Sequence, residues 1–172
     1  MTSFDHAGDA ELVAGGCVAL LRNGEWRGAL IRGPSGAGKS TLAVRLIALG
    51  GKLVSDDQTT LRRQGDAVLA TAPAAIAGLL ELRGTGLLRL PYEQSASISH
   101  VVDLSPNGQP APERCPAPRN THLLDMRFPL LCMRESSATA SALAVLMTEG
   151  RLEDPDAAVE EMVTSGGPGR SA

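Results

Sequence analysis

The chain has 172 residues, which favours one domain over two, and its net charge of -3 gives no basic patch for nucleic acid or an anionic membrane. Hydrophobic residues make up 43% of the chain but aromatic residues only 2%, so the core has to be packed mainly from Leu, Val, Ala and Ile. Cys17, Cys115 and Cys132 are far apart, which indicates reduced thiols rather than a disulfide framework or a zinc site. Without a signal-peptide pattern or an apolar run of membrane-spanning length, we expect a cytoplasmic protein.

In chain order, the pattern predicts a flexible arm, two hairpins, one early helix, several strands and one late helix. The flexible arm covers residues 1–10, and the first hairpin covers 17–33 around Asn23-Gly24. The remaining segments are a helix over 39–49, a buried strand over 52–57, a hairpin over 59–73, a bent strand or strand-loop-strand over 78–90, a strand over 97–105, a Pro-rich loop over 106–120, a strand over 128–133, a helix over 136–147 capped by Ser136 or Ser137, and a C-terminal segment over 151–172 with a disordered tail.

A phosphate-binding loop follows the first hairpin. The octapeptide matches G-x-x-x-x-G-K-[ST] and lies between a predicted strand and a predicted helix, as this motif requires. Its glycines let backbone N–H groups point inward, and the helix N-terminus favours an anion. Lys39 is expected to reach the β- and γ-phosphates of a nucleotide and Ser40 to hold Mg²⁺. The alternative is a Gly-rich turn that binds nothing. The motif residues are Gly33, Pro34, Ser35, Gly36, Ala37, Gly38, Lys39 and Ser40.

Two adjacent acids, Asp56 and Asp57, end the strand that follows the helix. A strand, helix and strand in this order form a βαβ unit, so both strands end at one edge of the sheet and the acids face the phosphates. Two acids beside a polyphosphate repel it unless Mg²⁺ neutralises charge or one acid accepts a proton from an attacking hydroxyl. The pair of acids therefore predicts phosphotransfer chemistry. The alternative is a purely structural role, in which the two acids only end a strand and begin a turn.

Glu81 and Arg83 form a charged pair in an otherwise apolar segment. Two residues apart on a strand, they share a face. Glu81 can supply another oxygen near the metal, and Arg83 can hold a phosphate or orient Glu81. The alternative is an ion pair on a half-exposed strand.

The segments GPSGAGKS, LVSDD and LELRGTGLLRL resemble, in this order, motifs of the HPr kinase/phosphorylase family in a short, single-domain form, over about residues 13–147. This resemblance implies an α/β fold over residues 11–150, a P-loop sheet domain of the HPr kinase and phosphoenolpyruvate carboxykinase type with hairpins. It also implies a protein serine kinase that uses ATP and Mg²⁺ to phosphorylate HPr, a phosphocarrier of the phosphotransferase system. The family's reverse reaction, that of a phosphorylase, uses inorganic phosphate and releases pyrophosphate.

By the same resemblance, residues 33–40 hold the nucleotide phosphates, and Ser40 with Glu81 holds Mg²⁺. Asp56 is the base that accepts the seryl proton, and Asp57 supports it or the metal. Arg134 is a candidate for a phosphate or partner contact. Further alternatives are a small-metabolite kinase and a nucleotide-sensing module, and self-association stays open.

Two positions depart from the family's usual pattern. Ala14 stands where the family usually has a histidine near the catalytic acid, and Thr41 stands where it usually has an acid after the serine of the loop. Both departures bear on the phosphorylase reaction more than on nucleotide binding.

Overall fold

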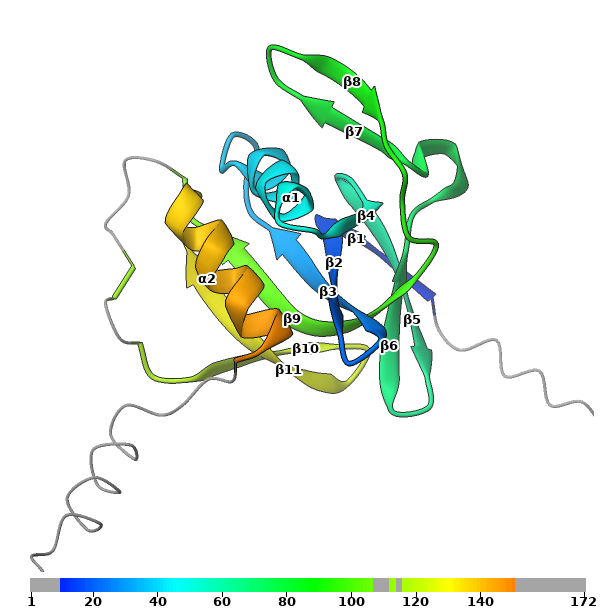
Figure 1. Cartoon of the computed structure of the whole chain (residues 1–172). Coiled ribbons are helices and arrows are strands. Elements are labelled where there is room, and N and C mark those ends of the chain that lie inside the picture. Colours follow the sequence, from blue (N-terminus) through cyan, green and yellow to red (C-terminus); the bar gives the residue numbers. More distant parts are fainter. Residues whose placement is uncertain (1–9, 107–111, 114–115, 151–172) are drawn as a thin grey trace, which may run out of the picture.

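The computed structural model describes residues 10–106, 112–113 and 116–150. The predicted flexible arm, except Ala10, and the predicted C-terminal segment lie outside these residues. Within the described part of the chain, a curled nine-stranded sheet carries two helices on one face, and a separate two-stranded ribbon projects beside them (Figure 1). This arrangement is the mixed α/β fold expected from the sequence.

The first hairpin delivers the chain to the phosphate-binding loop as predicted. β2 (Gly16–Arg22) pairs antiparallel with β3 (Glu25–Arg32). The turn between them places Asn23 at φ 52° and Gly24 at φ 81°, which fits the primed turns that match strand twist. α1 (Lys39–Ala48) begins directly after the loop, and the next strand is β4 (Lys52–Ser55).

β3 and β4 run parallel to each other with β2 between them. β2 is antiparallel to both, so the C-terminal ends of β3 and β4 lie at the same edge of the sheet. The prediction that the loop and the acid pair share an edge is therefore confirmed. The sequence pattern did not indicate that a third strand separates the two.

β9 (Ala96–Leu104) joins the two halves of the sheet. It pairs with β3 and β11 in parallel and with β6 antiparallel, so the sheet curls around it. The strand order is β1-β5-β6-β9-β3-β2-β4, with β11 on β9 and β10 on β11. The other elements are β1 (Ala10–Ala14), β5 (Gln58–Gln64), β6 (Ala67–Thr71), the 3-10 helix η1 (Ala74–Ile76), β7 (Leu79–Leu82), β8 (Gly86–Arg89), β10 (Arg119–Leu123), β11 (Met126–Met133) and α2 (Ser137–Thr148).

Two apolar clusters form the core, one on each face of the sheet. The first packs α1 and α2 against the sheet through Leu42, Leu46 and Leu143. The second fills the inside of the curl, and Phe128 is its one buried aromatic side chain among the described residues. Leu, Val, Ala and Ile make up most of both clusters, as the composition predicted.

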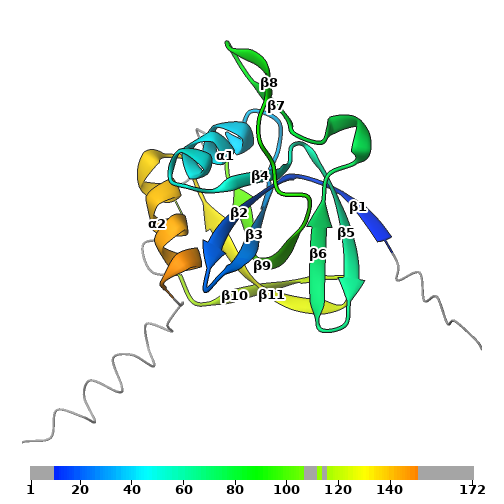
Figure 2. The same cartoon turned by 45° about the vertical axis from the view of Figure 1, so that its right-hand side comes forward.

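α1 lies between α2 and the β7–β8 ribbon in both views (Figures 1 and 2). α2 begins with Ser136 as its N-cap, whose Oγ accepts a hydrogen bond of 3.0 Å from the Thr139 N–H. In the described residues neither helix has the length and apolar character needed to cross a membrane.

Candidate functional site

The phosphate-binding loop connects β3 to α1 and is fixed at its base. Arg32, the last residue of β3, makes two hydrogen bonds of 2.7 and 3.0 Å to the carboxylate of Asp103 on β9. Gly33 has φ 146°, and a Cβ at this position would lie 2.7 Å from the carbonyl oxygen of Leu104. Only glycine therefore allows the loop to leave the sheet so close to β9.

The N-terminus of α1 presents a site for an anion. Its N-cap is Gly38, which has φ 96° and no side chain to cap the helix, and the first turn carries no acid. The N–H groups of the first turn have no partners within the helix, so they can bind a phosphate. Lys39 folds back over the loop, where its Nζ donates to the carbonyl oxygens of Gly33 at 3.1 Å and Pro34 at 3.3 Å.

The two acids occupy different environments. Asp56 is buried, with 8% of its surface exposed, and its Oδ2 accepts a hydrogen bond of 2.9 Å from the backbone N–H of Glu81. Asp57 is exposed and has φ 57°, the left-handed conformation of a tight turn. Its carbonyl oxygen accepts a hydrogen bond of 2.8 Å from the Gly15 N–H, which ties the acid turn to the junction of β1 and β2.

A buried chain of hydroxyl groups supports this turn. Thr59 Oγ1 donates to the carbonyl oxygen of Gly15 at 2.7 Å. Because its single proton is used there, Ser55 Oγ is the donor in the 2.6 Å bond between Ser55 and Thr59. Ser55 and Thr59 flank the acid pair, so the pair is held on both sides by residues that are themselves buried.

Burial raises the pKa of the Asp56 carboxyl above its ordinary value. The Glu81 N–H opposes this effect because it stabilises the carboxylate, while the negative charge of Asp57 raises the pKa further. A carboxylate with a raised pKa is a stronger proton acceptor than an ordinary surface acid.

An open cleft of about 340 Å³ collects most of the predicted side chains. Lys39 and Ser40 contribute from α1, Asp57 from the acid turn, and Glu81 and Arg83 from the ribbon. Asp56 does not line the cleft, but its Oδ2 accepts the hydrogen bond from the backbone N–H of Glu81, which does line it. The full lining is Ser35, Gly36, Gly38, Lys39, Ser40, Thr41, Asp57, Glu81, Leu82 and Arg83.

Arg83 differs from its predicted place. β7 ends at Leu82, so Arg83 is the first turn residue of the ribbon rather than a strand residue on the face of Glu81. In the described residues it forms no ion pair with Glu81, which leaves its guanidinium available to the cleft.

The oxygen donors of the cleft suit a Mg²⁺ ion that is shared with substrate phosphates better than a metal ion bound by protein side chains alone. The described residues contain no group of three or more His, Cys, Asp or Glu side chains arranged to hold a metal ion. Mg²⁺ is usually bound by one or two carboxylates together with phosphates of the substrate. Ser40, Asp57 and Glu81 provide one hydroxyl and two carboxylates beside the phosphate-binding loop, which is a suitable donor set for such a shared ion.

Two contacts of this site were missed from the sequence. The side chain of Glu135 packs on the loop so closely that a Cβ on Gly38 would lie 2.7 Å from its Cβ. Its carboxylate forms an ion pair of 2.7 Å with Arg45 on α1. Thr41, considered only as a departure from a pattern, lines the cleft itself. No local signal connects position 135 with position 38, because the contact depends on how α2 packs on α1.

Comparisons with known proteins agree with this geometry. A family model described as the HPr Serine kinase C-terminal domain matches residues 13–98, half of the chain. The HPr kinase/phosphorylase of Exiguobacterium sibiricum is 47% identical over 62 residues, which cover 36% of this chain and 20% of that protein. The HPr kinase/phosphorylase of Geobacillus thermodenitrificans is 42% identical over 88 residues, which cover 45% of this chain and 28% of that protein. The matched part is therefore less than a third of either relative.

The fold also matches a solved structure. The HPr(Ser) kinase/phosphatase from Coxiella burnetii superimposes with a TM-score of 0.68, covering 90% of this chain and 96% of that chain. The sequences are 18% identical, so this likeness establishes the fold. The match extends beyond residues 13–98 and includes most of the described elements.

Proposed function

The chain belongs to the HPr serine kinase C-terminal domain family, and from this premise we propose that it is a protein serine kinase that uses Mg·ATP to phosphorylate an HPr-like phosphocarrier of the phosphotransferase system. The relatives named above are called HPr kinase/phosphorylase, and the proposal extends that activity to this shorter chain.

One observation carries the proposal. The phosphate-binding loop, the acid turn and the ribbon surround a single cleft, with Lys39, Ser40, Asp57 and Glu81 on its walls. Phosphoryl transfer with a loose transition state depends mainly on positioning and on charge neutralisation. The cleft meets both requirements. Its loop positions the phosphates, while the Lys39 ammonium group and a Mg²⁺ ion held by the oxygen ligands neutralise their charge.

In this proposal the loop binds the β- and γ-phosphates through backbone N–H groups and Lys39. The ammonium group of Lys39 exchanges its bonds with Gly33 and Pro34 for phosphate oxygens. Mg²⁺ neutralises phosphate charge when it is bound by Ser40 and Glu81, with Asp56 or Asp57 as a further support. Arg83 holds a phosphate oxygen from the opposite wall of the cleft.

In this proposal Asp56 accepts the proton of the seryl hydroxyl, which requires the serine to reach past the cleft lining, since Asp56 is 8% exposed and is not part of that lining. Its raised pKa suits a base, and the Glu81 N–H on Oδ2 fixes the orientation of the carboxylate. In the reverse direction a protonated Asp56 returns the proton to the serine. Position 14, which is Ala14 here, pairs with Gln58 directly after the acid turn, so a histidine would lie close to the acids there. We expect phosphorylase activity to be the weaker of the two for this reason.

The shape of the cleft favours a protein as the acceptor. Asp57, Glu81 and Arg83 are all exposed, so the site opens outward instead of closing around a small molecule. A small-metabolite kinase needs a pocket that buries most of its substrate. The acceptor serine can reach this cleft on a surface loop of its protein.

The test is the intact mass of a purified HPr-like carrier after incubation with this protein, ATP and Mg²⁺. We expect one added phosphoryl group, and we expect Asp56→Asn to abolish it while nucleotide binding remains. Asp66→Asn, at an exposed turn between β5 and β6, is the matched control and should leave the transfer unchanged. Transfer that persists in Asp56→Asn would contradict the role of Asp56. An unmodified carrier with an ATP-binding wild-type protein would instead favour a nucleotide-sensing module.

A further inference from the structure

We propose that the nucleoside end of the bound nucleotide lies in a second, larger hollow between β11, the N-terminus of α2 and residues 116–119. This inference rests on the proposed function, because it takes the ligand of the phosphate-binding loop to be a nucleoside triphosphate. None of the residues that line the hollow lines the cleft described above.

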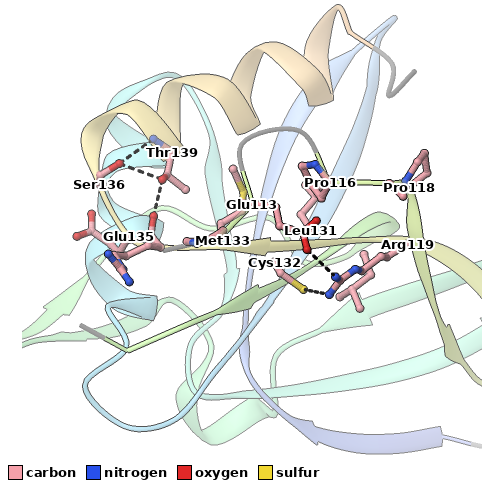
Figure 3. Close-up of a pocket in the computed structure, with 14 residues that line it drawn as sticks. Glu113, Pro116, Pro118, Arg119, Leu131, Cys132, Met133, Glu135, Ser136 and Thr139 are labelled. Carbon is pink, nitrogen blue, oxygen red and sulfur yellow. Dashed lines mark hydrogen bonds and ion pairs between the residues drawn. The ribbon is translucent and has the colours of Figure 1, made fainter. Parts of the chain in front are cut away.

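The hollow is large enough for a nucleoside. Its volume is about 670 Å³, within the range of about 300–1,000 Å³ for small-molecule sites. Leu131 and Met133 of β11 line the hollow, and Ser136 and Thr139 line it at the start of α2. Pro118 and Arg119 line it where the chain enters β10, the strand paired with β11 (Figure 3). Aliphatic side chains and prolines offer flat apolar contacts of the kind that a nucleobase can use.

The hollow borders the phosphate-binding loop through one pair of residues. Glu135 lines the hollow and Gly38 lines the cleft. The two residues touch, since a Cβ on Gly38 would lie 2.7 Å from Glu135 Cβ and 2.8 Å from its Cγ. A ligand whose phosphates bind over Gly38 therefore reaches the hollow after passing one side chain.

The acids determine which way the nucleotide points. The transferred phosphate has to lie beside the base and the metal ligands, on the side of Asp57 and Glu81. The nucleoside is attached to the other end of the triphosphate, so it leaves the loop on the side away from the ribbon. α1 separates the ribbon from α2 in both views, and the hollow lies on the α2 side (Figures 1 and 2).

The chemistry of the walls indicates how the base is held. The hydroxyl groups of Ser136 and Thr139 already have partners, because Ser136 Oγ accepts from the Thr139 N–H and Thr139 Oγ1 donates to the carbonyl oxygen of Arg134. Apolar contact with Leu131 and Met133 therefore contributes more than hydrogen bonds to the edge of the base. We expect adenine and guanine nucleotides to bind with similar affinity as a result.

The test compares Mg·ATP with Mg·tripolyphosphate by isothermal titration calorimetry. Tripolyphosphate carries the same phosphates without a nucleoside, so it reports the loop alone. Ala117→Trp fills the hollow from an exposed position, and Met133→Ala removes apolar contact from its wall. Val145→Trp, on an exposed face of α2 outside the hollow, is the matched control.

In either hollow variant we expect the Kd for ATP to rise about tenfold while the Kd for tripolyphosphate changes less than about twofold. Unchanged ATP affinity in both variants, or an equal loss for both ligands, would overturn the inference and leave the proposed function intact. ATP affinity that persists while transfer to the carrier is lost would also overturn it, since the hollow would then serve the acceptor. A wild-type protein that binds neither ligand would overturn the proposed function itself, and this inference with it.

Discussion

The backbone N–H of Glu81 donates a hydrogen bond of 2.9 Å to Oδ2 of Asp56, and this bond joins the ribbon to the acid turn. The ribbon is otherwise attached by the apolar face of Leu80, Leu82 and Leu88, which packs against the cluster beneath α1. A two-stranded ribbon is marginally stable by itself, so its position depends on these contacts. The positions of Glu81 and Arg83 in the cleft thus depend on the protonation state of the buried Asp56 carboxyl group, which accepts this hydrogen bond.

Asp56→Asn should make the protein more stable at neutral pH, by about 1 kcal/mol. The pKa of Asp56 is raised in the folded state, so the ionised form costs the folded state more than the unfolded state. Its contribution to stability is fully present below the unfolded pKa and is lost as pH rises through the folded pKa. The asparagine carbonyl can still accept the Glu81 N–H without carrying a charge.

Urea unfolding between pH 4 and pH 8 measures this effect, with Asp66→Asn as the control for loss of a surface acid. The difference between wild type and Asp56→Asn should widen as pH rises. A variant that is less stable than the wild type at pH 7 would show that the carboxylate is stabilising in the fold, contrary to its burial.

Lys39→Met should weaken ATP binding at least about tenfold and change the free energy of unfolding little. A hydrogen bond from a charged group to phosphate contributes about 1.5–3 kcal/mol, whereas in the free protein Lys39 bonds only to carbonyl groups of its own loop. Calorimetric titration with Mg·ATP provides the measurement. Lys52→Met, which removes the ion pair with Glu93, tests for a general effect of lost charge. Equal ATP affinity in Lys39→Met and wild type would contradict the role of this lysine.

Gly38→Ala should destabilise the protein more than Gly36→Ala. Both glycines have positive φ, 96° and 81°, where a Cβ costs about 1–2 kcal/mol. A Cβ at position 36 meets open space, whereas at position 38 it meets Glu135. A double-mutant cycle with Glu135→Ala removes the Cγ contact of 2.8 Å and leaves the Cβ contact of 2.7 Å, so it should recover part of the loss at position 38 and none at position 36. Equal losses for the two alanine variants, with no coupling to position 135, would argue against the close packing of Glu135 on the loop.

Cys17 should resist alkylation in the native protein. It is fully buried, and burial raises the pKa of its thiol to about 12, so almost no thiolate is present at pH 8. Half-buried Cys132 provides the comparison within the same chain. Mass spectrometry of peptides after iodoacetamide treatment measures both rates. We expect Cys17 to react only when urea unfolds the protein, and rapid labelling of Cys17 without urea would contradict its burial.

Local sequence patterns were sufficient for the elements that build the loop. The Asn23-Gly24 turn, the periodicity of α1 and the Gly50-Gly51 stop all act within a few residues, and each appears in the structure as predicted. β10 was missed because its residues, Arg119–Leu123, are polar and follow a Pro-rich segment, so their pairing with β11 depends on tertiary context.

The site shows the same division between local and distant causes. The loop and the acid pair were identified from their motifs, and the parallel direction of β3 and β4 places them together. The different burial of Asp56 and Asp57 could not be predicted, because it arises from the positive φ of Asp57 and from a bond to Glu81. The contact of Glu135 with Gly38 was equally inaccessible, since it depends on the packing of two helices far apart in sequence.

The dependence of the loop on Glu135 also bears on how the protein is made. On a ribosome the whole loop leaves the exit tunnel long before the segment that contains Glu135 has been translated. Chains grow at about 5–20 residues per second, so the nascent loop spends several seconds without the side chain that packs on Gly38. The contact between Glu135 and Gly38 can therefore form only after residue 135 has been translated and α2 has docked.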